Sequence, residues 1–72
     1  MKPMSPLHKS FGKKIKELRL EQGITQEKLA EMIDVDRSYM GFIERGERNP
    51  TLEKMRKIAK ALKVNVKDIF DF

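Results

Sequence analysis

Apolar residues recur in the first third of the chain at intervals of three and four, which is the period of one face of an α-helix. Phe11, Ile15 and Leu18 follow this period, with lysines between them. Ser10 is a suitable N-cap, and Gly23 is a suitable stop because glycine tolerates the left-handed backbone that ends many helices. We therefore predict an amphipathic helix between Ser10 and Gly23.

Two short helices joined by a tight turn are predicted next. Thr25 can cap the first of them, which reaches about Ile33. Asp34 follows at a position that can need a positive φ, and Asp36 can cap the second helix. The positions at which two such helices must touch are all apolar or small, namely Leu29, Ala30, Ile33, Val35, Met40 and Ile43. Residues 26–45 therefore form a helix-turn-helix candidate.

The last third of the chain predicts two further helices. Gly46 supplies a left-handed stop for the third helix, and Thr51 can cap a fourth. The apolar face of this fourth helix consists of Leu52, Met55, Ile58, Ala59 and Leu62. Residues 65–68 have the pattern of a capping box in which Asp68 stands where Glu is usual, and one last turn ends at Phe70.

Five short helices with brief connections predict an all-α fold, a compact five-helix bundle that contains the helix-turn-helix. The 72 residues suffice for one domain, since so small a core needs nearly every apolar residue. We expect a flexible N-terminal segment over residues 1–9 and the folded domain over residues 10–72.

The composition excludes several classes of site. The chain has no cysteine and one histidine, His8, which rules out disulfides, thiolate zinc sites and Cys/His nucleophile pairs. The sequence shows no carboxylate pair, no nucleophile with a base and no glycine-rich phosphate loop. We therefore expect no enzyme activity, no catalytic or metal-binding residues, no cofactor and no small-molecule ligand.

The N-terminal stretch predicts no targeting segment. Pro3 and Pro6 interrupt it, and seven apolar residues never run together there, as a secretory signal or a membrane span requires. We expect a cytoplasmic protein with no membrane partner.

Charge is unevenly distributed along the chain. The 16 Lys and Arg against 11 Asp and Glu give a net charge of +5, which favours a polyanionic partner through counterion release. Residues 1–20 hold six basic residues and one acidic (+5), residues 21–47 hold three and seven (−4), and residues 48–72 hold seven and three (+4). Because the helix-turn-helix lies in the acidic middle, the basic flanks must supply much of the attraction to a polyanion.

Three stretches of the sequence carry a family resemblance: IKELRLEQGITQEKLAEMIDVD, IERGERNPTLEKM and KIAKALKVNVKDIF. Along residues 11–70 the chain resembles the phage Cro and repressor family of helix-turn-helix regulators, which includes the small XRE-like proteins. The segment DRSYMGFIERGERNPT is most similar to the controller proteins of restriction-modification systems. The resemblance implies a lambda-repressor-like DNA-binding domain. This chain has Asp34 and Lys63 where the family commonly has glycine, and a left-handed lysine costs on the order of 1 kcal/mol.

The first turn of the predicted third helix is the candidate for base reading, because the N-terminal residues of a recognition helix reach base edges in the major groove. Arg37 can bond O6 and N7 of guanine in a fork, and Ser38 can bond several bases. Gly41 and Phe42 lie on the same side, where a missing side chain at Gly41 lets the backbone approach DNA closely. Phe42 either covers a thymine methyl group or packs under the N-terminal segment.

Helix ends and the loop after the third helix are candidates for phosphate contacts. The resemblance implies this role for Gln26, which stands at the positive end of the second helix. Tyr39 can bond a phosphate or stack on the neighbouring helix. The loop adds Arg45, Arg48, Asn49 and Thr51, although Thr51 is also expected to cap the fourth helix.

Glu44 places a negative charge in the helix that is expected to meet DNA. Phosphates repel an outward carboxylate, so we expect Glu44 to point inward and to need a cation there. The resemblance implies that the cation is Arg19 in the first helix. We expect this ion pair to be structural.

The end of the chain carries more apolar and aromatic surface than one short helix needs for its own packing. The residues concerned are Val66, Ile69, Phe70 and Phe72, and exposed patches of this kind usually mark an interface. The alternative is that Ile69 and Phe70 close the core of one protomer. The resemblance implies a homodimer through this region, with two recognition helices about 34 Å apart on an inverted repeat.

The sequence thus predicts a transcriptional regulator that binds double-stranded DNA sequence-specifically as a homodimer. Its resemblance to controller proteins implies control of a restriction-modification operon. The alternative is an antitoxin or a protein-interaction adaptor that retains the fold, which the acidic second helix with Glu27 and Glu31 favours. A steep loss of affinity with salt, together with discrimination among DNA sequences, distinguishes the regulator from the adaptor.

Overall fold

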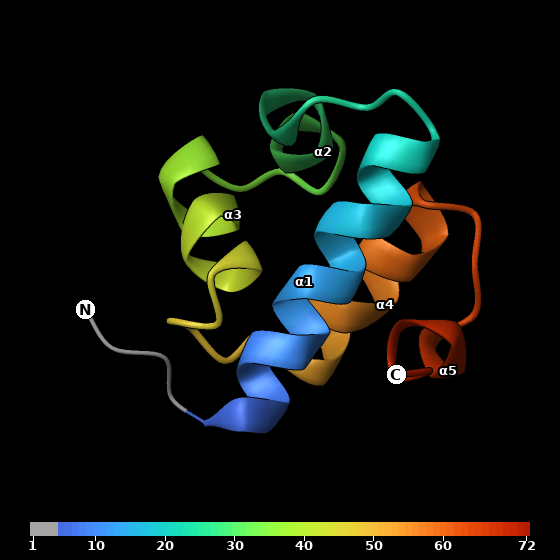
Figure 1. The fold of residues 1–72 in the computed structure, drawn as a ribbon. Coiled ribbons are helices and arrows are strands. Elements are labelled where there is room, and N and C mark those ends of the chain that lie inside the picture. Colours follow the sequence, from blue (N-terminus) through green and yellow to red (C-terminus); the bar gives the residue numbers. More distant parts are fainter. Residues whose placement is uncertain (1–4) are drawn as a thin grey trace.

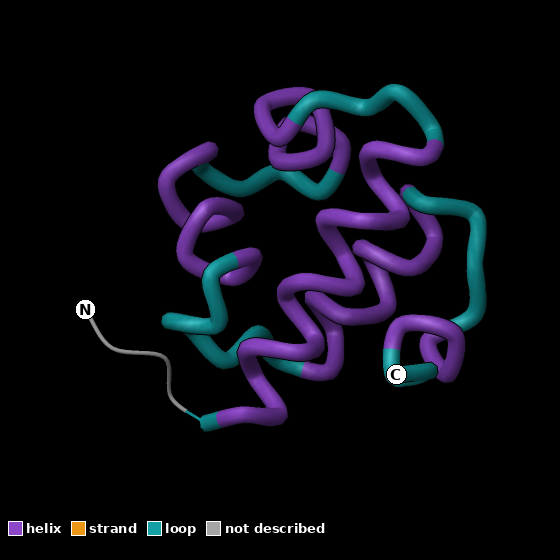
Figure 2. The backbone as a smooth tube through the Cα atoms, viewed as in Figure 1, coloured by secondary structure: helices purple, strands orange, loops and turns teal. Residues whose placement is uncertain are grey.

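The computed structural model describes residues 5–72, and this part of the chain consists of helices and their connections (Figures 1 and 2). The helices are α1 (Pro6–Glu21), α2 (Gln26–Met32), α3 (Arg37–Glu44), α4 (Leu52–Ala61) and α5 (Val66–Ile69). The predicted all-α five-helix fold is confirmed. Within residues 5–72, every helix is too short or too polar to cross a bilayer.

Helix α1 begins earlier than predicted. The N-cap is Ser5 rather than Ser10, and its Oγ accepts a hydrogen bond of 3.2 Å from a backbone N–H in the first turn. Pro6 takes the first helical position, where its fixed φ is already helical and its missing N–H is not needed. The prediction of a flexible N-terminal segment is therefore wrong for residues 6–9, which are helical, and residues 1–4 lie outside the described residues.

The other helix starts follow the predicted caps. The Oγ1 atoms of Thr25 and Thr51 accept first-turn amides at 3.0 and 3.1 Å. Asp68 accepts the N–H of Asn65 at 2.8 Å, as the capping-box pattern predicts. Asp36 takes the N-cap position of α3, but its side chain makes no capping hydrogen bond.

One hydrophobic core joins the five helices. Its buried members are Phe11, Ile15, Leu29, Ala30, Ile33, Met40, Ile43, Ile58, Ala59, Leu62 and Ile69. Five of the six predicted contact points between α2 and α3 are among them, and Val35 packs against the cluster half-buried. In Figure 1, α1 crosses the middle of the molecule with α2 and α3 on one side and α5 on the other.

Four connections use left-handed backbone. The φ angles are 68° at Gly23, 58° at Asp34, 75° at Gly46 and 59° at Lys63. The positive φ expected at Asp34 is confirmed. Gly46 is needed for a second reason, because a Cβ there would stand 2.6 Å from the Cα of Lys9 in α1. The turn after α3 can pack this closely on α1 only with glycine.

Candidate nucleic-acid interface

Predicted site residues surround one shallow hollow beside α3. The hollow has a volume of about 380 Å³ and is lined by Gln26, Arg37, Ser38, Gly41, Phe42 and Arg45. Arg37 and Ser38 are exposed in the first turn of α3, and Arg45 is exposed at its end. The structure therefore gathers the four predicted base-reading residues and two of the predicted phosphate contacts on one side. We call this group of six residues the recognition face.

A buried ion pair lies beneath the recognition face. The guanidinium of Arg19 donates from Nε to Oε2 of Glu44 at 2.8 Å and from Nη2 to Oε1 at 3.0 Å. The two side chains are only 8% and 3% exposed. Arg19 also donates to the carbonyl oxygen of Ile24 at 2.8 Å, so it ties α1 to α3 and to the loop before α2. This fork-to-fork geometry neutralises the Glu44 carboxylate inside the protein, away from any polyanion.

Gln26 is joined to the same carboxylate. Its Nε2 donates to Oε1 of Glu44 at 3.2 Å, and the side chain is half-buried. One amide N–H is thereby committed, and the second remains as the donor for a ligand. The predicted phosphate contact of Gln26 stays a prediction, and the Glu44 hydrogen bond supplies a reason for a fixed amide orientation.

Phe42 is half-exposed and holds two arginines. The guanidinium carbons of Arg45 and Arg48 lie 5.1 and 5.5 Å from the centroid of its ring. Arg45 also donates from Nε to Glu47 at 3.0 Å. Cation–π contacts of this length favour a fixed position for both charges. The sequence reasoning missed this cluster, although Phe42 and Arg45 have the i, i+3 spacing that brings side chains together on a helix.

Gly41 differs from its predicted role. It is buried, because the guanidinium of Arg45 lies across it. A Cβ at this position would stand 3.0 Å from Nη1 of Arg45 and 3.5 Å from Oε1 of Gln26. The space left by the missing side chain is therefore occupied by protein, and direct backbone contact with DNA at Gly41 would need Arg45 to move away.

The remaining predicted phosphate contacts have different surroundings. Arg48, Asn49 and Thr51 are exposed in or beside the loop between α3 and α4. Thr51 already uses its hydroxyl to cap α4. Tyr39 is half-buried and packs against the core, which is the alternative to a phosphate contact that the sequence left open.

A glycine that the sequence analysis did not single out sets the position of α3. Gly12 of α1 is buried, and a Cβ there would stand 2.6 Å from the carbonyl oxygen of Glu44. The backbones of α1 and α3 therefore meet directly at this point. A glycine inside a helix costs stability, so its presence in the middle of an otherwise regular helix was the signal that could have revealed this contact.

The predicted interface residues at the chain end divide into two groups. Ile69 is fully buried in the core, so it is placed wrongly in an interface between protomers. Phe70 is 38% exposed and Phe72 is 61% exposed, while Val66 is half-buried. The ring centroid of Phe70 lies 5.1 Å from that of Phe11 and 6.4 Å from that of Phe72.

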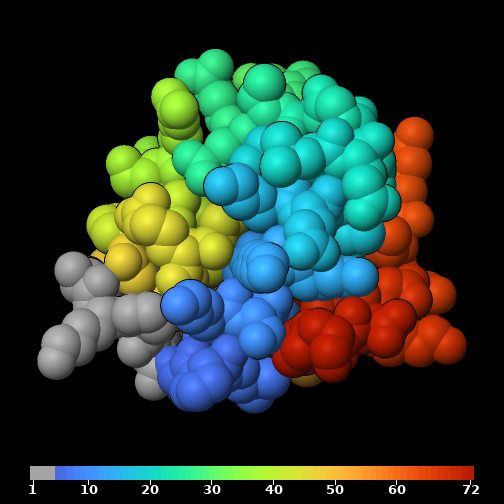
Figure 3. All heavy atoms as spheres, viewed as in Figure 1, coloured from blue at the N-terminus to red at the C-terminus, as the bar shows by residue number. Residues whose placement is uncertain are grey.

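Helix α1 extends this exposed apolar surface. Leu7 is 55% exposed and lines the same 170 Å³ cavity as Phe11 and Phe70. Figure 3 shows the first turns of α1, in blue, against the C-terminal residues, in red. We call Leu7, Phe70 and Phe72 the C-terminal patch.

Comparison with known proteins places this arrangement among helix-turn-helix proteins. Residues 15–69 match the family HTH_3, described as helix-turn-helix. Control protein C.BamHI from Bacillus amyloliquefaciens is 48% identical over 63 residues, which are 86% of this chain and 78% of the relative.

Two crystal structures have the same fold. The restriction-modification controller protein C.AhdI from Aeromonas hydrophila superposes with a TM-score of 0.84 at 42% identity, over 86% of this chain and 94% of its own. The biofilm regulator SinR, in a structure described as a complex with DNA, gives a TM-score of 0.79 at 35% identity, over 85% of this chain and 98% of its own. The likeness therefore includes α2, α3 and most of the remaining chain.

Proposed function

This chain belongs to the HTH_3 family of helix-turn-helix proteins, and we propose that it is a sequence-specific DNA-binding regulator of transcription. The resemblance to the XRE-like regulators that the sequence predicts is confirmed by the family match. The observation that carries the proposal is the recognition face, where exposed Arg37 and Ser38 open α3 beside further basic side chains. The relative SinR, whose structure is that of a DNA complex, supports DNA as the partner.

The recognition face divides the work between base reading and phosphate binding. Arg37 forks onto guanine and Ser38 bonds a neighbouring base as the first turn of α3 enters the major groove. Arg45 and Arg48, held on the ring of Phe42, bind phosphates on one side of that groove. Gln26 binds a phosphate at the start of α2, with its amide orientation fixed by Glu44.

The protein acts as a homodimer on an inverted repeat. The C-terminal patch supports this step, because its two exposed phenylalanines and Leu7 form a continuous apolar surface with the cavity beneath. An isologous contact through this patch places two copies of α3 about 34 Å apart, one helical turn of DNA. Neither protomer then needs a long recognition helix of its own.

Control of a restriction-modification operon is the specific role that the relatives support. C.BamHI is a control protein, and C.AhdI is a restriction-modification controller protein. Both are matched over most of their own length, so the likeness is not confined to a shared motif. A regulator of such an operon acts on DNA in the cytoplasm.

Fluorescence anisotropy with labelled duplexes tests the DNA-binding proposal. The promoter region upstream of the gene for this chain and a scrambled duplex of the same composition are titrated at several salt concentrations. We expect affinity for both duplexes to fall steeply with salt and the promoter duplex to bind about a thousandfold or more tightly than the scrambled one. Equal, weak and salt-independent binding of both duplexes would contradict DNA binding and favour the adaptor.

A further inference from the structure

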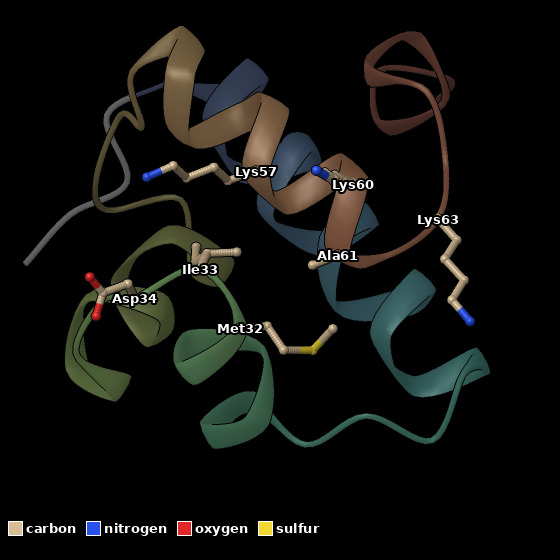
Figure 4. Close-up of a pocket in the computed structure, with 7 residues that line it drawn as sticks. All are labelled: Met32, Ile33, Asp34, Lys57, Lys60, Ala61 and Lys63. Atoms are coloured by element: carbon tan, nitrogen blue, oxygen red, sulfur yellow. The ribbon is translucent and has the colours of Figure 1, made fainter.

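A second surface lies away from the recognition face. An open groove of about 550 Å³ runs between α2 and α4 and shares no lining residue with the recognition face. We call it the α2–α4 groove. Its apolar part consists of Met32 and Ile33 at the end of α2 and Ala61 at the end of α4 (Figure 4). Met32 is 45% exposed, so an adaptable apolar side chain faces solvent here.

Three lysines line the α4 side of this groove. Lys57 and Lys60 project from α4, and Lys63 follows in the next turn (Figure 4). They recur at every third residue and so extend over roughly 9 Å along the helix direction. Within residues 5–72, the ion pairs of the structure involve none of these three lysines. The groove therefore combines an apolar floor with a row of positive charge.

Backbone strain marks the same groove. Asp34 and Lys63 are the non-glycine residues with left-handed backbone among residues 5–72, and both line it. Glycine adopts such a backbone without the penalty of about 1–2 kcal/mol that a Cβ brings. Strain that persists in a folded protein points to a use for the side chain concerned. Two charged side chains are thus kept at this groove where the backbone alone favours glycine.

We propose that the α2–α4 groove binds an acidic peptide segment of a partner protein. The segment places a bulky apolar side chain between Met32 and Ala61 and presents carboxylates to the three lysines. A helix with acidic residues at intervals of three or four matches the spacing of Lys57, Lys60 and Lys63. Asp34 on the α2 side repels carboxylates, so it fixes which edge of the peptide faces α4.

The chemistry of the groove fits a peptide better than a second DNA contact. Phosphates are satisfied by lysines alone and leave the apolar side chains of Met32 and Ala61 exposed to water. A peptide with both acidic and apolar residues covers the floor and neutralises the row of lysines together. Since the recognition face lies elsewhere, this partner and DNA can be bound at the same time.

Nuclear magnetic resonance with a synthetic probe tests the proposal. The probe is a helical peptide with glutamates at every third or fourth position around a single leucine, and the control peptide has serine in place of that leucine. We expect the leucine peptide to shift the amide signals of Met32, Asp34 and Ala61 while Arg37 and Ser38 stay unchanged. Shifts confined to the recognition face, or equal binding of the serine peptide, would overturn the proposal.

Charge variants sharpen the assignment. The double variant Lys57→Gln/Lys60→Gln should bind the leucine peptide about tenfold more weakly, as two partly desolvated ion pairs imply. The matched control Lys13→Gln/Lys16→Gln, which removes the same charge from α1, should bind it as the wild type does. If the groove variant loses affinity for DNA but keeps its affinity for the peptide, the lysines are phosphate contacts and the proposal is wrong.

Lys63→Gly separates this function from a purely structural explanation. The glycine relieves the left-handed strain, so we expect the variant to unfold at a higher urea concentration than the wild type. It should nevertheless bind the leucine peptide severalfold more weakly, because one charge of the row is lost. Higher stability with unchanged peptide affinity would contradict a binding role for Lys63.

Discussion

The recognition face and the C-terminal patch present two different kinds of surface. On the recognition face, the exposed polar side chains are held from below by the buried pair of Arg19 and Glu44 and from the side by Phe42. On the C-terminal patch, exposed Phe70 and Phe72 contact each other, and Phe70 contacts Phe11. A surface that reads a fixed pattern of hydrogen-bonding groups needs such internal support, whereas an apolar surface needs mainly area and shape.

The largest effect is expected from removing the support of the recognition face. Glu44→Ala leaves the guanidinium of Arg19 buried without its partner, which should lower the free energy of unfolding by about 3–5 kcal/mol. Urea denaturation measures this loss. The matched control is Glu53→Ala, which breaks an exposed Arg–Glu pair and should cost less than about 1 kcal/mol. If the two variants are equally stable, the buried pair does not support the recognition face.

The second prediction concerns the C-terminal patch. Phe72→Ser removes an aromatic side chain that becomes buried on dimerisation, so the dimer should weaken by about 1.5–3 kcal/mol. Sedimentation equilibrium should show the dissociation constant rising tenfold or more. Leu20→Ser, at an exposed apolar residue on α1, is the control and should leave the dimer intact. A dimer unaffected by Phe72→Ser would place the interface elsewhere.

Arg37→Ala should alter specificity rather than overall attraction to DNA. Loss of the guanine fork should reduce discrimination at one base pair in each half-site by about tenfold to a hundredfold, as the loss of one bidentate contact implies. Competition assays with single-base variants of the operator measure this change. Lys16→Ala, which removes a charge from α1, should leave the preference at every base pair intact. Full discrimination by Arg37→Ala would contradict the role of the first turn of α3.

The smallest effect is expected at Phe42. Phe42→Leu keeps the apolar bulk but removes the ring that holds Arg45 and Arg48, which should weaken DNA binding severalfold, by about 0.5–1 kcal/mol. The salt dependence of affinity should become shallower, because the phosphate contacts are less well placed. Phe42→Tyr should restore both quantities. If instead Phe42→Leu changes the preference for one T·A base pair, the ring contacts a thymine methyl group.

The elements of this fold were predictable because local chemistry determines them. The spacing of Phe11, Ile15 and Leu18 predicts α1, and the hydroxyls of Thr25 and Thr51 cap α2 and α4 as expected. The start of α1 was predicted wrongly because Ser5 followed by Pro6 is an equally good helix start, and the apolar period gives no sign of it.

The surroundings of the site were harder to predict because they depend on tertiary contacts. Helical spacing places Gly41 and Phe42 on the same side as Arg37, but it does not show that Arg45 covers Gly41. It also does not distinguish Ile69, which is buried in the core, from Phe72, which is exposed. Such distinctions depend on which neighbouring helix lies nearby, and the sequence pattern of one helix does not contain that information.

Selection of bound duplexes from a random DNA library tests the central claim most directly, since the selection itself identifies the operator. The account predicts recovery of an inverted repeat whose half-sites lie about one helical turn apart, with a guanine in each half-site that is no longer selected by the Arg37→Ala variant. Recovery of sequences without a shared motif would contradict sequence-specific recognition by α3.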